Sequence, residues 1–170
     1  MSLMLVLGGA RSGKSALAEQ RVLQTGQPPV YIATAQAWDD EMRERIAEHR
    51  ARRDGQGWET IEAPLDLARA LTALPPVRPV LVDCLTLWLT NHLLAGHDLD
   101  AQAAALLDVL QRPGLTVLVS NEVGLGIVPD NALARRFRDA AGRLNQQVAA
   151  RAETVVFTAA GLPLLLKGSL

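Results

Sequence analysis

The sequence has few of the residues that mark several large classes of protein. Cys84 is its one cysteine, so the chain has neither a partner for an internal disulfide nor a cysteine set for a zinc site. Because Cys84 sits within an apolar run, we expect it to be a small buried side chain. Acidic and basic residues nearly cancel, to a formal net charge of −1. A chain without a basic surplus lacks the attraction that dominates binding to nucleic acids, so we expect no nucleic-acid partner.

Long apolar runs are also missing. No stretch approaches the ~20 apolar residues that a membrane-spanning helix requires, and the first residues lack the basic segment and the length of a secretion signal. We therefore expect a cytoplasmic protein without a membrane span. Apolar residues are nevertheless plentiful, at 49% of 170 residues, which is enough for a substantial core. The length is typical of a single domain over residues 1–170.

Short apolar segments alternate with helical patterns along the whole chain. Apolar runs of strand length, typical of strands buried on both faces, occupy residues 3–7, 30–33, 80–82, 115–119 and 155–158, with weaker candidates at 58–61 and 162–166. Helical patterns occupy residues 14–25, 38–53, 65–74, 85–94, 101–110 and 133–151. Strands that alternate with helices favour parallel pairing through right-handed crossovers. The sequence thus predicts a three-layer α/β domain with a mostly parallel sheet and helices on both faces.

The most informative motif directly follows the first predicted strand. It fits the pattern Gly-x-x-x-x-Gly-Lys-Ser/Thr with Gly8, Gly9, Ala10, Arg11, Ser12, Gly13, Lys14 and Ser15. The glycines let successive backbone amides point at phosphate oxygens, and the following helix adds its positive N-terminal end. In this pattern Lys14 contacts the β- and γ-phosphates, and the Ser15 hydroxyl ligates Mg²⁺. The alternative is a glycine-rich turn without function. We favour a P-loop NTPase-type, RecA-like enzyme that binds a purine triphosphate with Mg²⁺.

A carboxylate follows the predicted strand at residues 80–82. Ligands gather at the carboxyl ends of the strands in open α/β sheets, where Asp83 is expected to lie. We therefore predict that Asp83 holds Mg²⁺, directly or through water. The alternative is that Asp83 caps the helix that begins near residue 85.

One of the three histidines has an unusual setting. His92 and His97 lie around the end of a predicted helix, and we expect both to be exposed to solvent. Arg45, His49 and Arg53 instead recur at intervals of four along one face of another predicted helix. Cationic neighbours disfavour the imidazolium and would grip nucleotide phosphates, which suits a neutral histidine that attacks phosphorus. The spacing by itself leaves an ordinary surface histidine as the alternative.

Several motifs extend over nearly the whole chain. After the P-loop come Tyr31-Ile32-Ala33-Thr34-Ala35, Asp39-Asp40-Glu41-Met42, Arg45-Ile46, His49-Arg50, Trp58, Thr60, Glu62, Asn121-Glu122-Val123-Gly124, Gly126-Ile127-Val128-Pro129, Arg138-Asp139, Gly142-Arg143 and Asn145-Gln146. In this order they resemble the bifunctional adenosylcobinamide kinase/adenosylcobinamide-phosphate guanylyltransferase family of cobalamin biosynthesis.

The resemblance implies two reactions and a set of site residues. The hydroxyl of the aminopropanol arm of adenosylcobinamide is phosphorylated from ATP or GTP, and GMP then passes from GTP through a guanylylated histidine to give adenosylcobinamide-GDP. His49 and Lys14 are the implied catalytic residues. The family's contacts to guanine nucleotide fall on Ala33, Thr34, Ala35, Arg50, Ala51, Arg52, Arg53, Glu62 and Asp83. The resemblance also implies a homo-oligomer, such as a homotrimer.

The chain departs from the family pattern in three places. Glu48 precedes His49 where some members have a second histidine, so one candidate nucleophile remains. The stretch after Arg53 is one residue longer than usual, which leaves open whether Arg52 or Arg53 contacts nucleotide. Asp83 stands where some relatives carry Glu, and either carboxylate suits Mg²⁺.

Two other functions are compatible with the P-loop. A simple small-molecule kinase without a covalent step needs no particular residue at position 49. A RecA-like nucleotide-dependent binding or assembly module needs a basic surface if its partner is DNA, and the charge balance disfavours it.

Overall fold

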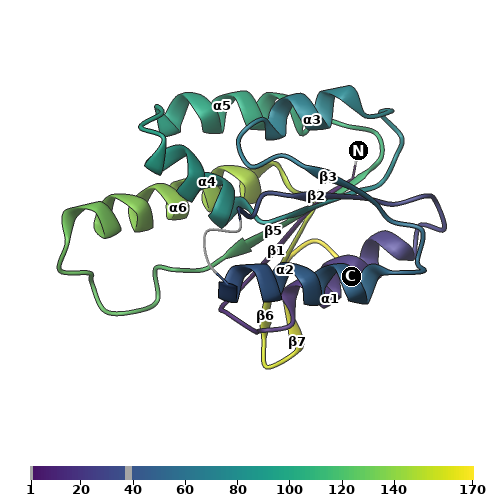
Figure 1. Cartoon of the computed structure of the whole chain (residues 1–170), viewed down its shortest axis with the longest axis horizontal. Helices are drawn as coiled ribbons and strands as arrows, with labels where there is room; N and C mark the ends of the chain where they lie inside the picture. Colours follow the sequence, from purple (N-terminus) through teal and green to yellow (C-terminus); the bar gives the residue numbers. More distant parts are fainter. Residues whose placement is uncertain (1, 37–39) are drawn as a thin grey trace.

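A seven-stranded sheet lies at the centre of the fold (Figure 1). The computed structural model describes residues 2–36 and 40–170, and within them the strands follow the order β3-β2-β4-β5-β1-β6-β7. Their bounds are β1 Ser2–Gly8, β2 Val30–Ala33, β3 Glu59–Glu62, β4 Val80–Asp83, β5 Leu115–Asn121, β6 Thr154–Ala159 and β7 Leu162–Lys167. Neighbouring strands pair in parallel, except that β7 runs antiparallel to β6. The predicted mostly parallel sheet is confirmed.

Helices cover both faces of this sheet, which confirms the predicted three layers. They are α1 Lys14–Leu23, α2 Asp40–Arg53, α3 Leu67–Ala73, α4 Leu85–Leu94, α5 Leu99–Val109 and α6 Ala132–Arg151. Figure 1 shows α1 and α2 on one side and α3 to α6 on the other. Val22 of α1 lies in one apolar cluster, whereas Leu85, Leu106 and Leu144 of α4, α5 and α6 lie in the second.

Strand β1 contributes to both clusters. Leu3, Leu5 and Leu7 pack beneath α3 to α6, and Met4 and Val6 pack beneath α1. Successive side chains of a strand point to opposite faces of the sheet. A central strand covered on both sides therefore needs an unbroken apolar run, which is the pattern that the sequence shows.

The element boundaries lie within two residues of those predicted, and two of the differences have clear local reasons. Helix α5 begins before residue 101 because the Asp98 carboxylate accepts hydrogen bonds from the backbone N–H groups of Asp100 and Ala101, at 3.0 and 3.1 Å. Strand β5 continues past its apolar run to Asn121, which pairs with Gly8 at the end of β1. Polar side chains conceal this extension in the sequence, since backbone pairing does not depend on them. Within the described parts of the chain, no helix has both the length and the apolar character that crossing a membrane requires.

A buried arginine stabilises the turn between α3 and β4, at the end of the sheet opposite the P-loop. Arg112 precedes β5 and is only 7% exposed. Its guanidinium donates hydrogen bonds to the backbone carbonyls of Leu71, Pro75 and Arg78. These carbonyls end α3 and lead into β4, so a single side chain fixes that turn against the start of β5.

We expect Arg112→Met to lower the free energy of unfolding by about 1–3 kcal/mol, because buried carbonyls lose their donors. Urea unfolding followed by circular dichroism measures this change. Arg151→Met is the matched control, since Arg151 is exposed at the end of α6. Equal stability of the two variants would contradict a structural role for Arg112.

Candidate active site

The P-loop motif forms a tight turn between β1 and α1. Gly13 has φ +95° and Arg11 φ +53°, so both adopt left-handed backbone conformations just before α1 begins at Lys14. Lys14 Nζ donates a hydrogen bond to the Gly9 carbonyl at 2.9 Å and thus lies over the loop. The positive end of α1 and the Lys14 ammonium point to the same small region, which suits an anionic group.

The tip of the β6–β7 hairpin packs against the P-loop. The N–H of Gly161 donates a hydrogen bond to the Ser12 carbonyl at 2.9 Å. A Cβ atom on Gly8 would lie 2.5 Å from both the Ser12 hydroxyl oxygen and the Thr158 carbonyl, and one on Gly13 would lie 3.0 Å from Gly161 Cα. Two of the motif's glycines are therefore required by packing as well as by phosphate access.

Asp83 lies at the same edge of the sheet as the P-loop. It ends β4, which pairs with β5, and β5 pairs in turn with β1. Helix α1 packs against β5 and β4, and Ser15 is in its first turn. The N-cap residue of α4 is Cys84, so the alternative that Asp83 is its N-cap is wrong.

Ser15 and Asp83 provide a hydroxyl and a carboxylate, the hard oxygen donors that Mg²⁺ prefers. Among the described residues, no three histidine, cysteine, aspartate or glutamate side chains gather as a metal site. In nucleotide enzymes Mg²⁺ generally keeps several waters and takes further ligands from the phosphates.

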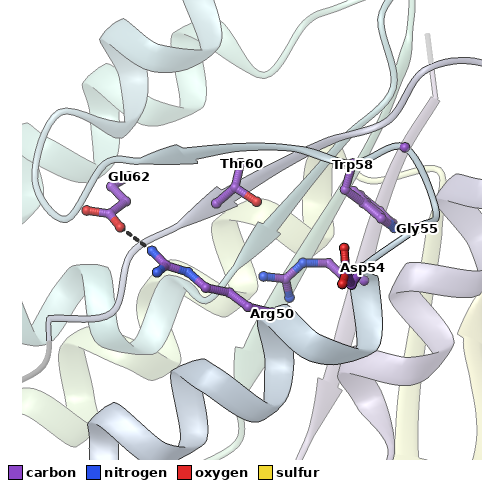
Figure 2. A pocket seen from close by; sticks show the side chains of 8 residues that line it. Arg50, Asp54, Gly55, Trp58, Thr60 and Glu62 are labelled. Carbon is purple, nitrogen blue, oxygen red and sulfur yellow. Dashed lines mark hydrogen bonds and ion pairs between the residues drawn. The ribbon is translucent and has the colours of Figure 1, made fainter.

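A second polar region lies between the end of α2 and β3 (Figure 2). It is an open cavity of about 520 Å³ lined by Arg50, Arg53, Asp54, Gly55, Gly57, Trp58, Thr60 and Glu62. Figure 2 shows Arg50 reaching across it to Glu62 on β3, with an ion pair of 2.5 Å between Nη2 and Oε1. Ala51 is exposed on α2. Three of the predicted nucleotide contacts, Arg50, Arg53 and Glu62, therefore line this cavity.

The predicted nucleophile is carried by α2. His49 lies one turn before the end of the helix, within its predicted range. The side chains of His49, Arg45 and Arg52, together with residues 37–39, lie outside the described residues. Arg53, the remaining arginine of the predicted face, is only 5% exposed, and its guanidinium lies over the ring of Tyr31.

Comparisons with known proteins place this arrangement in a family. A family model described as cobinamide kinase/cobinamide phosphate guanyltransferase matches residues 4–166. The chain belongs to this family. The sequence is 56% identical over 168 residues to the bifunctional adenosylcobalamin biosynthesis protein CobP of Pseudomonas aeruginosa, covering 96% of each chain. It is 42% identical over 182 residues to the proteins named CobU of Escherichia coli and Salmonella typhimurium, covering 97% of this chain and 99% of theirs.

A solved structure also resembles the fold. The RadB recombinase matches with a TM-score of 0.55 over 92% of this chain and 73% of its own, at 18% sequence identity. This likeness confirms the predicted RecA-like P-loop fold. Family membership confirms the resemblance drawn from the motifs, and with it the enzyme class of a kinase and guanylyltransferase.

Two motifs of this family, distant in sequence, meet beside the P-loop. Asn145 of α6 donates a hydrogen bond from Nδ2 to the Asn121 carbonyl at 3.4 Å, and the N–H of Asn121 donates to the Thr86 hydroxyl at 2.7 Å. The next N–H, that of Glu122, donates to the Gly8 carbonyl at 3.2 Å. These bonds fix the end of β5 against the first glycine of the loop.

Thr34, another predicted nucleotide contact, is fully buried. Its hydroxyl donates to the Cys84 carbonyl at 2.7 Å and accepts from the Cys84 N–H at 2.8 Å. The Asn91 side-chain amide donates to the Thr34 carbonyl at 2.9 Å. In this structure the Thr34 side chain therefore joins β2 to β4, while Ala33 and Ala35 beside it are half-buried.

The expectation for Cys84 is confirmed, and one expectation for the histidines is wrong. Burial, and next the Asp83 charge, raise the pKa of the Cys84 thiol to about 12, so it stays protonated.

His97 is exposed as expected, but His92 is only 2% exposed. It packs on Trp88, and its Nε2 lies 3.2 Å from the Leu65 carbonyl. Burial lowers its pKa. Other elements pack against several sides of helix α4, so a polar residue such as His92 does not indicate a face exposed to solvent.

Sequence reasoning assigned no role to Tyr31, which contacts the site directly. Its hydroxyl donates to Asp83 Oδ2 at 3.1 Å. Burial, and next the Asp83 charge, raise its pKa well above the usual 10, so it remains a donor. A signal was present, because the one tyrosine of the chain stands in an otherwise aliphatic buried strand.

Because the β6–β7 hairpin packs against Gly8, we expect Gly8→Ala and Gly9→Ala to differ in their effect on stability. Gly8→Ala places a methyl group against the Thr158 backbone, and we expect a loss of about 1–3 kcal/mol in the free energy of unfolding, typical of overpacking. Gly9→Ala is the control, because a Cβ there has no atom within 4 Å, and its change should stay below about 0.5 kcal/mol. Thermal unfolding without nucleotide measures both. Equal losses would mean that the hairpin does not constrain Gly8.

Proposed function

We propose that this chain carries out both reactions of its family, phosphorylating adenosylcobinamide and then transferring GMP to the new phosphate. The observation that carries the proposal is the family match over residues 4–166, in a fold whose P-loop and Asp83 share one edge of the sheet. The substrates are adenosylcobinamide or its phosphate, with ATP or GTP as donor. The product is adenosylcobinamide-GDP.

The P-loop serves the kinase step in this proposal. The amides of residues 8–15, the start of α1 and Lys14 bind the β- and γ-phosphates. Ser15 and Asp83 would hold Mg²⁺, which neutralises charge on the phosphates when it is bound. The substrate hydroxyl oxygen attacks the γ-phosphorus, the bond to the nucleoside diphosphate breaks, and the hydroxyl proton is released to water. Lys14 stabilises the charge that accumulates on the transferring oxygens.

Helix α2 and the cavity beside it serve the transferase step. An imidazole nitrogen of His49 attacks the α-phosphorus of GTP, pyrophosphate leaves, and a phosphoramidate forms. The phosphate oxygen of adenosylcobinamide phosphate then attacks that phosphorus, and the bond to nitrogen breaks. Two displacements replace a single difficult one.

The cavity suits a guanine nucleotide in chemical terms. The Glu62 carboxylate accepts hydrogen bonds only, and guanine offers an N1–H and a 2-amino group where adenine has neither. Arg50, released from Glu62, provides a fork of donors for phosphate. Family resemblance adds Ala33, Thr34, Ala35, Ala51, Arg52 and Arg53 as further proposed contacts.

We also propose a cytoplasmic homo-oligomer, such as a homotrimer. Leu162, Leu164 and Leu166 are more than half exposed on β7, an edge strand of the sheet. Contiguous exposed leucines on an edge strand are typical of surfaces that associate.

Lys14→Ala tests the kinase site. We expect phosphorylation of adenosylcobinamide to fall by at least about 100-fold, because the variant loses the cation that stabilises the transferring phosphoryl group. A radiolabelled γ-phosphate assay measures it, with Arg21→Ala, an arginine of the last turn of α1, as the control. Near wild-type rates in Lys14→Ala would contradict the assigned role of the loop.

His49→Ala tests the transferase step. The wild-type chain incubated with GTP and Mg²⁺ should gain the mass of one GMP, in an adduct that is labile to acid and stable to base, as a phosphoramidate is. His49→Ala should lose the adduct and the GMP transfer while it keeps phosphorylation, which depends on Lys14. Intact-mass spectrometry measures the adduct.

Glu48→Ala, changed at the preceding exposed residue, is the matched control and should retain the adduct. An adduct that persists in His49→Ala would assign the nucleophile elsewhere. A wild-type chain that phosphorylates its substrate but neither forms an adduct nor transfers GMP would support the simple kinase instead.

A further inference from the structure

Arg53 ends α2 in an unusual environment. Its guanidinium carbon lies 3.4 Å from the centroid of the Tyr31 ring, and its Nη1 lies 3.5 Å from Glu19 Oε1 on α1. Its Nε and Nη1 are buried and make no hydrogen bond. A buried guanidinium without a full set of hydrogen bonds is held by the ring and the carboxylate beside it. The end of α2 is thus attached to the sheet through the face of Tyr31.

Tyr31 connects this contact to the candidate metal ligand. Its ring, 4% exposed, also meets Trp58 edge-on, with centroids 6.1 Å apart and planes at 86°. Its hydroxyl donates to Asp83 Oδ2 at 3.1 Å. Because the aromatic ring is rigid, a movement of its face displaces the hydroxyl that orients the carboxylate.

The two ends of this chain of contacts lie at different parts of the proposed enzyme. Arg53 and Trp58 line the cavity between α2 and β3, and Arg53 lies one helical turn beyond His49. Asp83 lies at the P-loop edge of the sheet. Tyr31 is buried and contacts both parts, because its ring meets Arg53 and Trp58 while its hydroxyl donates to Asp83.

We propose that Arg53 and Tyr31 are positioning residues that couple α2, the helix of the transferase step, to Asp83 in the kinase site. The inference rests on the proposed function for the roles of α2 and Asp83. The packing of the Arg53 guanidinium on the Tyr31 ring sets the position of the Tyr31 hydroxyl and, through it, the orientation of the Asp83 carboxylate. By the reciprocity of linked equilibria, nucleotide in the cavity and divalent metal at the P-loop then alter each other's affinity.

Tyr31→Phe isolates the hydroxyl. The variant keeps the ring that Arg53 and Trp58 contact and loses only the hydrogen bond to Asp83. Loss of a partner that orients a metal ligand weakens metal affinity by about 10-fold to 100-fold, and we expect a change of about 10-fold here. The measurement is Mn²⁺ binding by electron paramagnetic resonance, with the chain saturated by a non-hydrolysable ATP analogue. The Mg²⁺ concentration that gives half-maximal kinase rate should rise in parallel.

Arg53→Met tests whether α2 acts through the same hydroxyl. We expect about 3-fold weaker Mn²⁺ binding in the wild-type background and no further change in the Tyr31→Phe background, the signature of two residues in one pathway. Arg53→Lys keeps the cation and should restore most of the affinity, which also serves if Arg53→Met folds poorly. Arg112→Met is the matched control, a buried arginine at the opposite edge that should lose stability with unchanged Mn²⁺ affinity.

Several outcomes would overturn the coupling. Unchanged Mn²⁺ affinity in Tyr31→Phe would show that the hydroxyl does not orient the metal ligand. Additive effects of Arg53→Met and Tyr31→Phe would show independent packing contacts. These results differ from failure of the proposed function, because a wild-type chain that phosphorylates without forming a GMP adduct would end the transferase proposal while leaving the Mn²⁺ measurements intact.

Discussion

The parallel pairing of β1 with β5 and of β5 with β4 is the constraint on which the candidate site depends. It sets Gly8 opposite Asn121 and Asp83 opposite Val119, and thereby fixes the P-loop and the carboxylate at one edge of the sheet. Backbone hydrogen bonds in a buried sheet are costly to break, because water cannot replace them. A slip in this register would separate the two groups even if every local motif were kept.

Polar side chains buried around that edge maintain the register. Thr34 ties β2 to β4, and Asn145 and Thr86 form hydrogen bonds with the backbone of Asn121 at the end of β5. Each satisfies backbone groups that would otherwise be buried without partners, which makes the arrangement specific as well as stable. At the opposite edge, Arg112 does the same for the turn after α3. The polar residues of the core therefore determine the positions of the loops at both ends of the strands.

In the proposed function, the two reactions use different surfaces of one sheet. The P-loop edge is formed by strand ends and the start of α1, whereas the cavity is formed by the end of α2 and the edge strand β3. Between them stands Tyr31, with Arg53 on its face and Asp83 at its hydroxyl. Because both surfaces belong to one small domain, a buried side chain that touches both is a natural point of contact between them.

The sequence by itself determined the architecture and the motifs. The apolar run at residues 3–7, the glycines of the P-loop and the alternation of strands and helices are local patterns, and local patterns report periodicity and backbone freedom directly. Tertiary structure alone decided the rest: that Gly161 supports the P-loop, that His92 is buried, and that Arg53 lies on Tyr31. These contacts join residues far apart in the chain, and spacing within one element carries no information about what a different element brings against it.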